Sequence, residues 1–147
     1  MRLLILPVLI LLPLSALAAA KHISFDALPN AVQRAALLEM HSGIMRGCSS
    51  ETENGKTIYE VETLTSNGKR VLSFDAAGNL VEAEEQIPLA TVPPAALKGL
   101  KKQAAGGTIR SVESVKRGNT TGYEAVVVKN GKSREVAVDA NGNPAHD

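Results

Sequence analysis

The chain of 147 residues has no tryptophan and contains only two tyrosines and two phenylalanines. Its core must therefore be aliphatic, because 44% of the residues are hydrophobic and only 3% are aromatic. The chain also has a single cysteine, Cys48, which excludes an internal disulfide. We expect Cys48 to be a buried structural thiol, and the alternative is an intermolecular disulfide or a reactive thiol.

The chain lacks an apolar run long enough to cross a membrane. The longest run, residues 3–14, contains two prolines and falls short of the roughly 20 residues that a spanning helix needs. It follows Arg2 and precedes a segment rich in small residues, which is the order of a secretory signal peptide cleaved after Ala18 or Ala20. We therefore expect residues 1–20 to be a signal peptide and the mature protein to be periplasmic or secreted, without membrane insertion.

Neither sign of charge dominates. The 16 basic residues include Arg2, so beyond it 15 basic residues face 15 acidic ones. A neutral exported chain does not suit a general nucleic-acid or membrane-surface role, and no aromatic residues interleave with the lysines near 98–102. The halves differ, since residues 21–88 hold 6 basic and 10 acidic residues and residues 89–147 hold 9 and 5. Either two solvated surfaces have drifted apart, or the halves or neighbouring molecules are electrostatically complementary.

Two short segments have the pattern of helices that pack on a sheet. Residues 28–40 place Pro29 in the first turn, where its missing N–H costs nothing, and repeat small or apolar residues every four positions. A second segment begins at Pro93-Pro94 and ends before Gly106-Gly107. Neither helix is expected to be stable alone. The apolar stripes are Val32, Ala36 and Met40 in the first segment and Ala96, Leu100 and Ala104 in the second.

Strand signals follow each helix. The Asn-Gly dipeptide, which adopts the positive φ angles of tight hairpins, occurs at 54–55, 67–68, 130–131 and 141–142. Alternation of apolar and polar residues predicts an antiparallel sheet with one face covered and the other wet. The last strand, near Ser133, is expected either to be an open edge or to pair elsewhere. Strands are expected near residues 45–53, 57–65, 69–75, 80–87, 108–117, 121–129 and 132–139.

Most of the sequence pattern occurs twice, 64 residues apart. The shift aligns Tyr59-Glu60 with Tyr123-Glu124, and the turn at Asp75 with the turn at Asp139. We therefore predict an α+β fold of two tandem repeats, residues 21–88 and 89–147, each a short helix packed on one face of an antiparallel meander sheet. The second repeat lacks the last strand, and the short link near residues 86–91 predicts one continuous or closely abutted sheet.

The helix start with Leu-Pro, the Tyr-Glu-Val strand, the Asn-Gly hairpin and the Asp-x-x-Gly-Asn turn together resemble the PepSY-like families of exported bacterial proteins. The tandem form resembles the fold of the β-lactamase inhibitory protein, and the likeness covers nearly all of residues 25–143. The resemblance implies a domain that binds or restrains secreted or envelope peptidases. The chain departs from it in lacking a peptidase domain, the final strand of the second repeat and disulfides.

Catalysis and a resident cofactor are not expected. The histidines His22, His41 and His146 lie outside any pattern that pairs a base with a nucleophile. His22 with Asp26, or His41 with Cys48, lacks the second pair of ligands that structural zinc requires. We therefore predict no enzyme activity and no metal site.

The segment from Asp139 to Asn143 begins like a calcium-binding loop. The twelfth position of such a loop needs a bidentate Glu, and from Asp139 that position falls beyond residue 147. At the related turn, Ala77 stands where an oxygen ligand would be needed. Both segments are therefore predicted to be plain turns, in which Asp accepts local N–H groups and Gly takes a left-handed conformation.

Protein binding is the function that these exclusions leave. A sheet with helices on one face exposes its other face, whose charged residues either contact a partner or only maintain solubility, and edge pairing by the last strand is a second mode. The expected partner is a protein, such as a secreted or envelope peptidase. The alternative is a periplasmic sensing or structural protein that binds a small ligand or metal. The candidate partner-binding residues are Glu60, Glu62, Arg70, Glu124, Lys129 and Arg134.

Overall fold

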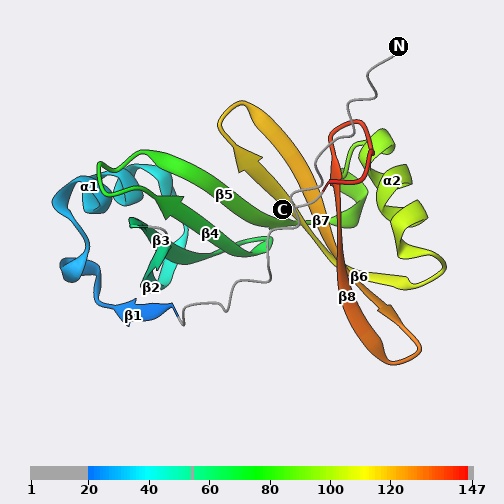
Figure 1. The fold of residues 1–147 in the computed structure, drawn as a ribbon, viewed down its shortest axis with the longest axis horizontal. Helices are drawn as coiled ribbons and strands as arrows, with labels where there is room; N and C mark the ends of the chain where they lie inside the picture. The colour runs from blue at the N-terminus through cyan, green and yellow to red at the C-terminus, as the bar shows by residue number, and fades with distance from the viewer. Residues whose placement is uncertain (1–19, 54, 146–147) are drawn as a thin grey trace, which may run out of the picture.

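In the computed structural model, which describes residues 20–53 and 55–145, the strands form one antiparallel sheet (Figure 1). The eight strands lie side by side in the order of the sequence, so each is hydrogen-bonded to its neighbours along the chain. The expected signal peptide lies outside the described residues apart from Ala20, as does His146. The strands are β1 (Lys21–Ile23), β2 (Ile44–Glu53), β3 (Lys56–Thr65), β4 (Gly68–Phe74), β5 (Leu80–Ile87), β6 (Thr108–Arg117), β7 (Thr120–Lys129) and β8 (Lys132–Asp139).

The helices occupy two connections of this meander. A 3-10 turn, η1 (Phe25–Ala27), and the helix α1 (Asn30–Glu39) link β1 to β2. A second 3-10 turn, η2 (Leu89–Thr91), and the helix α2 (Pro94–Ala104) link β5 to β6. Both α-helices begin directly after a proline, as expected from the fixed φ of that residue. Figure 1 shows α1 and α2 near opposite ends of the sheet.

The predicted α+β fold of two tandem helix-and-sheet repeats is wrong. β5 was expected to end the first repeat, but it pairs with β6 from Ala83↔Lys116 to Ile87↔Val112. The hydrogen-bond ladder therefore continues through all eight strands, and two helices of 10 and 11 residues are additions to one dominant meander. The physical reason is that the outer edge of β5 needs hydrogen-bond partners, and β6 supplies them. A local sequence pattern specifies each strand but does not specify where a sheet stops.

The individual strands lie where the sequence predicts them, within one residue at each end. β1 is the exception, because its three residues are too few to show an alternation. The Asn130-Gly131 hairpin has the expected positive φ angles, 52° and 73°. β8 is an edge strand, partly covered by a bridge between Val138 and Pro144 and by the Ala145 N–H, which donates to the Ala137 carbonyl.

The core lies between the helices and one face of the sheet, in two clusters of small and aliphatic side chains. Cys48 belongs to the first cluster, as expected, and burial raises the pKa of its thiol. Each cluster combines one side of a helix with every second residue of the strands beneath it. The first comprises Leu28, Val32, Ala36, Cys48, Val61, Leu72 and Phe74, and the second comprises Val92, Ala96, Leu100, Ala104, Val112, Ala125, Val127, Val136 and Val138.

Two Asp-x-x-Gly-Asn turns hold the sheet against the helices, and both are the plain turns that the sequence predicts. In the first, Asp75 Oδ1 accepts the N–H groups of Ala77 and Asn79, each at 2.9 Å. Asp139 makes the same bonds to Asn141 and Asn143. Hydrogen bonds from the side-chain amides of Asn79 and Asn143, together with these backbone bonds, lower the pKa of the two aspartates. The glycines of the turns, Gly78 and Gly142, have φ of +84° and lie against the carbonyl oxygens of Ala31 in α1 and Ala95 in α2. A side chain at either glycine would push the helix away.

Candidate functional site

The face of the sheet opposite α1 and α2, here called the helix-free face, carries most of the glutamates of the strands. Its residues follow from the register. Val61 pairs with Leu72 and Leu72 with Ala83 on the helix side, so the residues next to each of them point the other way. The glutamates on this face include Glu51, Glu60, Glu62, Glu82, Glu84, Glu113, Glu124 and Glu135, and the basic residues include Lys56, Lys69 and Arg117, with Arg46 lining a second hollow beside Glu60 and Glu62.

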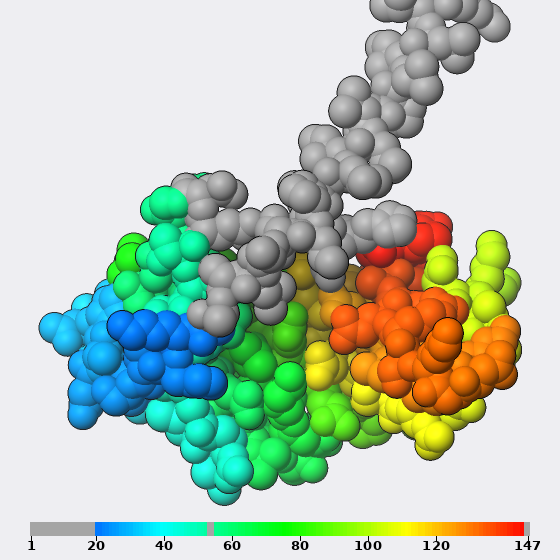
Figure 2. Space-filling model, turned by 60° about the horizontal axis from the view of Figure 1, so that its bottom comes forward, coloured from blue at the N-terminus to red at the C-terminus, as the bar shows by residue number. Residues whose placement is uncertain are grey.

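Glu84 lies near the middle of the helix-free face, because β4 and β5 are the central strands of the sheet. Figure 2 shows these green strands between the blue N-terminal segment and the orange β8. The neighbours of Glu84 across the ladder are Val71 and Val115. Burial raises the pKa of Glu84 to about 7, with the carboxylates of Glu82 and Glu113 adding to the shift and Lys69 opposing it. The centre of this face is therefore a place where one more negative charge is costly.

Glu84→Gln is expected to remove a loss of stability that occurs as pH rises. A glutamate with an ordinary pKa of 4.5 in the unfolded chain and about 7 in the folded one binds a proton more tightly when folded. Its favourable contribution is full below about pH 4.5 and is lost as pH rises through 7. We expect the variant to gain about 1 kcal/mol relative to the natural protein between pH 5 and pH 8, because solvent screens a half-buried group.

Urea unfolding at pH 5 and pH 8, followed by circular dichroism, measures this difference. The matched control is Glu62→Gln, which removes the same charge from an exposed position on the same face. An equal pH dependence in the two variants would contradict the assignment to Glu84.

A hollow of about 570 Å³ lies on the helix-free face over β2 to β6. Two carboxylates on its wall already have partners: Ser49 Oγ donates to Glu60 Oε2 at 3.0 Å, and Arg117 forms an ion pair with Glu82. The wall of the hollow therefore carries charged groups that already have partners within the chain, while no side chain of the described residues fills the hollow itself. The lining residues are Glu51, Lys56, Ile58, Glu60, Ser73, Val81, Glu82 and Arg117.

The structure places the three candidate glutamates on one face, with Glu60 and Glu62 on β3 and Glu124 on β7, and places the three candidate basic residues elsewhere. Glu60, Glu62 and Glu124 lie on the helix-free face. The basic residues share the helix side of the sheet with the core, and each donates to a carbonyl at the C-terminal end of a helix. The pairs are Arg70 with Glu39, Lys129 with Ala105 and Arg134 with Gln103.

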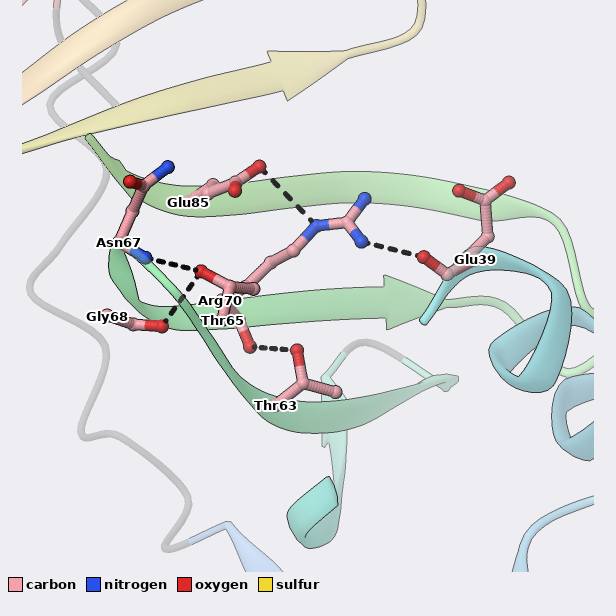
Figure 3. Close-up of polar contacts among 7 residues, drawn as sticks. All are labelled: Glu39, Thr63, Thr65, Asn67, Gly68, Arg70 and Glu85. Carbon is pink, nitrogen blue, oxygen red and sulfur yellow. Dashed lines mark hydrogen bonds and ion pairs between the residues drawn. The ribbon is translucent and has the colours of Figure 1, made fainter. Parts of the chain in front are cut away.

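Arg70 shows what these cations do (Figure 3). Its Nη1 donates to the Glu39 carbonyl at 2.6 Å, its Nε lies 3.7 Å from Glu85 Oε2, and its side chain is 14% exposed. Its own carbonyl accepts a hydrogen bond from Thr63 Oγ1 at 3.3 Å. A positive charge at the C-terminal end of a helix offsets the partial negative charge of the last carbonyls. The role that these contacts indicate is stabilisation of the helix ends.

Arg70→Met is expected to lower the free energy of unfolding by about 1.5 kcal/mol, the size of a hydrogen bond to a charged group. Methionine fills similar space but cannot donate to the Glu39 carbonyl. Urea unfolding monitored by circular dichroism measures the loss. The control is Lys98→Met on the exposed side of α2, which should change the stability by less than about 0.5 kcal/mol. Equal effects of the two substitutions would show that Arg70 does not stabilise α1.

The alternation of residues along each strand indicates which face of the sheet each charged residue occupies, and the sequence-based prediction did not use it. Arg70 lies two residues before Leu72 on the same strand, and Arg134 lies two residues before Val136. Side chains two residues apart point to the same face of a strand, so both arginines belong to the helix side of the sheet. The same rule places Glu82 and Glu84 of β5 opposite Ala83, on the helix-free face. Glu82, Glu84 and Glu113 were missed because β5 and β6 were assigned to different repeats, although they are adjacent strands.

Within residues 20–53 and 55–145, no group of three or more His, Cys, Asp or Glu side chains is arranged to hold a metal ion. In the same part of the chain, no helix has the length and apolarity needed to cross a membrane.

No protein-family model matches the chain, and no curated protein matches it. Solved structures match its fold over most of its length. A Bacteroides eggerthii protein described as periplasmic has a TM-score of 0.65 at 14% identity, covering 81% of this chain and 86% of its own. A DUF2874 family protein from Bacteroides ovatus has a TM-score of 0.64 at 13% identity, covering 82% and 86%. A BLIP-like protein from Bacteroides fragilis has a TM-score of 0.61 at 17% identity, covering 81% and 84%.

These identities are low, so the likeness concerns the fold alone. The expected periplasmic or secreted location agrees with the description of neighbours as periplasmic, and the expected resemblance to the β-lactamase inhibitory protein agrees with the BLIP-like neighbour. The chain therefore has a BLIP-like fold.

Proposed function

We propose that this protein is a non-catalytic periplasmic binding module that holds a partner protein against its helix-free face. The observation that carries the proposal is the distribution of charge. Glutamates gather on the face that no helix covers, whereas Arg70, Lys129 and Arg134 are directed to helix ends on the other face. A protein partner with a basic surface is the complement of such a face.

Physical chemistry supports this use of the face. A surface on which one sign of charge predominates steers an oppositely charged partner and speeds its association. Hydrogen bonds among strands make the sheet rigid, so its side chains are held in place before the partner arrives. Burial raises the pKa of the Glu84 carboxyl to about 7, and the nearby carboxylates of Glu82 and Glu113 add to the shift, so a cation brought close to these carboxylates would relieve part of their repulsion.

The comparisons support the proposal at the level of fold. One structural neighbour is described as BLIP-like and another as periplasmic, and the sequence begins like an exported protein. The PepSY resemblance of the sequence adds a specific version, in which the partner is a secreted or envelope peptidase that the protein restrains.

The experiment is a crosslinking pull-down from the periplasm, scored by mass spectrometry. The test bait carries Glu60→Lys, Glu82→Lys and Glu124→Lys on the helix-free face, and the control bait carries Lys98→Glu, Lys101→Glu and Lys102→Glu on exposed positions of α2. We expect one protein to be enriched by the natural and control baits and lost from the test bait by about tenfold or more. A partner retained by the test bait, or lost equally from both altered baits, would overturn the assignment to the helix-free face.

The peptidase version has its own measurement. If the captured partner is a peptidase, its hydrolysis of a small peptide substrate should fall in the presence of the natural protein and not in the presence of the test bait. A captured peptidase whose rate is unaffected would contradict restraint while leaving binding in place.

A further inference from the structure

Ser73 is a largely buried polar residue that lines the 570 Å³ hollow. It lies in β4, faces away from the helices and is only 6% exposed. Its hydroxyl makes no hydrogen bond with any residue in the described part of the chain. Among the described residues, the only fully buried side-chain polar atom without a hydrogen-bond partner is Arg70 Nε, so the Ser73 hydroxyl opens onto the hollow and can bond a group that enters it.

The residues on both sides of Ser73 are hydrogen-bond acceptors. Across the ladder, Ser73 pairs with Glu60 on β3 and with Glu82 on β5, and all three line the hollow. Each carboxylate uses part of its acceptor capacity within the chain, Glu60 for Ser49 and Glu82 for Arg117. A carboxylate has about four lone-pair sites, so both can accept further hydrogen bonds. A group that fits this hollow must donate several hydrogen bonds and carry positive charge.

The chain itself shows that the hollow accommodates a guanidinium group. Arg117 lines it and forms an ion pair with Glu82, while half of the Arg117 side chain, 50%, stays exposed at the rim. Ser73 and Glu60 line the same hollow as this pair. A planar guanidinium has five donors and can bond several acceptors at once, which a lysine ammonium does less well.

We propose that the hollow over Ser73 receives an arginine side chain of the partner protein, whose guanidinium donates to Glu60, Ser73 Oγ and Glu82. This inference rests on the proposed function and names the chemistry of the partner at one position. The unpaired Ser73 hydroxyl then has a role in the complex that it lacks in the free protein. The Glu82–Arg117 ion pair lies at the side of the incoming group and orients the Glu82 carboxylate.

The experiment measures binding of a short peptide with one central arginine, followed by the backbone amide signals of the protein in nuclear magnetic resonance spectra. A peptide with citrulline in place of arginine is the control, because citrulline has the same shape without the charge. We expect saturable shifts at Ser73 and its neighbours on β3 and β5, with about tenfold weaker binding of the citrulline peptide. Equal shifts with both peptides, or shifts spread over the whole surface, would overturn the proposal.

Variants separate a binding role of Ser73 from a structural one. Ser73→Ala should weaken arginine-peptide binding about fivefold while the urea midpoint stays the same, because the substitution removes no hydrogen bond within the described part of the chain. Glu60→Gln and Glu82→Gln should each weaken binding about tenfold. The matched control is Asp26→Asn, which removes one charge from an exposed position in η1 and should bind as the natural protein does. Unchanged binding by Ser73→Ala, or equal weakening by Asp26→Asn, would refute the arginine site.

Failure of this inference can be told apart from failure of the proposed function. If the captured partner is lost by charge reversal of the helix-free face but binds Ser73→Ala normally, the arginine site is wrong and the binding face stands. If charge reversal has no effect on capture, the binding face itself is wrong.

Discussion

Gly99→Ala is expected to lower the free energy of unfolding by about 3 kcal/mol, at the upper end of the usual cost of overpacking a core. A Cβ atom on residue 99 of α2 would lie 2.2 Å from the Gly142 carbonyl oxygen and 2.7 Å from its Cα. Both atoms belong to the backbone, so no side-chain rotation can relieve the contact. The turn cannot withdraw easily either, because Asp139 holds it through hydrogen bonds to Asn141 and Asn143.

Urea unfolding followed by far-ultraviolet circular dichroism measures this loss. The matched control is Gly47→Ala in β2, where an added Cβ meets no atom within 4 Å. That change should be neutral or stabilising by up to about 1 kcal/mol, because glycine weakens a strand. Similar stabilities of the two variants would show that α2 and the Asp139 turn are not in close contact.

Phe74→Ala is expected to cost about 4 kcal/mol, as deletion of a fully buried aromatic side chain does. Phe74 is 0% exposed and is one of the two phenylalanines in the chain. It packs with Leu72 and Val61 beneath α1, where the other side chains are too small to fill the cavity. The control is Leu80→Ala on β5, whose side chain is 36% exposed and whose loss should cost less than about 1 kcal/mol.

Together the two substitutions test whether the sheet unfolds as one unit. Gly99 lies against the second core cluster and Phe74 lies within the first, but β5 and β6 join the strands beneath both. We therefore expect each variant to shift one cooperative transition of the whole protein. Two separate transitions, with only one shifted in each variant, would mean that the β5–β6 pairing does not couple the two ends of the sheet.

The sequence by itself determined the local elements. The alternation in segments such as Tyr59 to Thr63 gave the strand boundaries, because a side-chain period of two is a property of the extended backbone. Asn130-Gly131 predicted a hairpin since its φ angles suit few other residue pairs. The turns at Asp75 and Asp139 were predictable for the same reason, because their hydrogen bonds link residues at most four apart.

Only the tertiary structure decided how these elements combine. Pairing of β5 with β6 joins residues separated by the whole of α2, and no local pattern measures the free energy of that contact. The short link near residues 86–91 predicted one continuous or closely abutted sheet, and the sheet is continuous. The repeated sequence nevertheless suggested two helix-and-sheet repeats, because it describes the strands of each half and says nothing about the edge between them. The composition of the candidate site depends on the same contact, since Glu84 lies beside Glu113 only when β5 and β6 are neighbours. The fold also decided what the charged residues of each face contact. Arg70 and Arg134 donate to helix carbonyls because the helix ends lie within reach of their long side chains. The glutamates of the opposite face have no helix beside them.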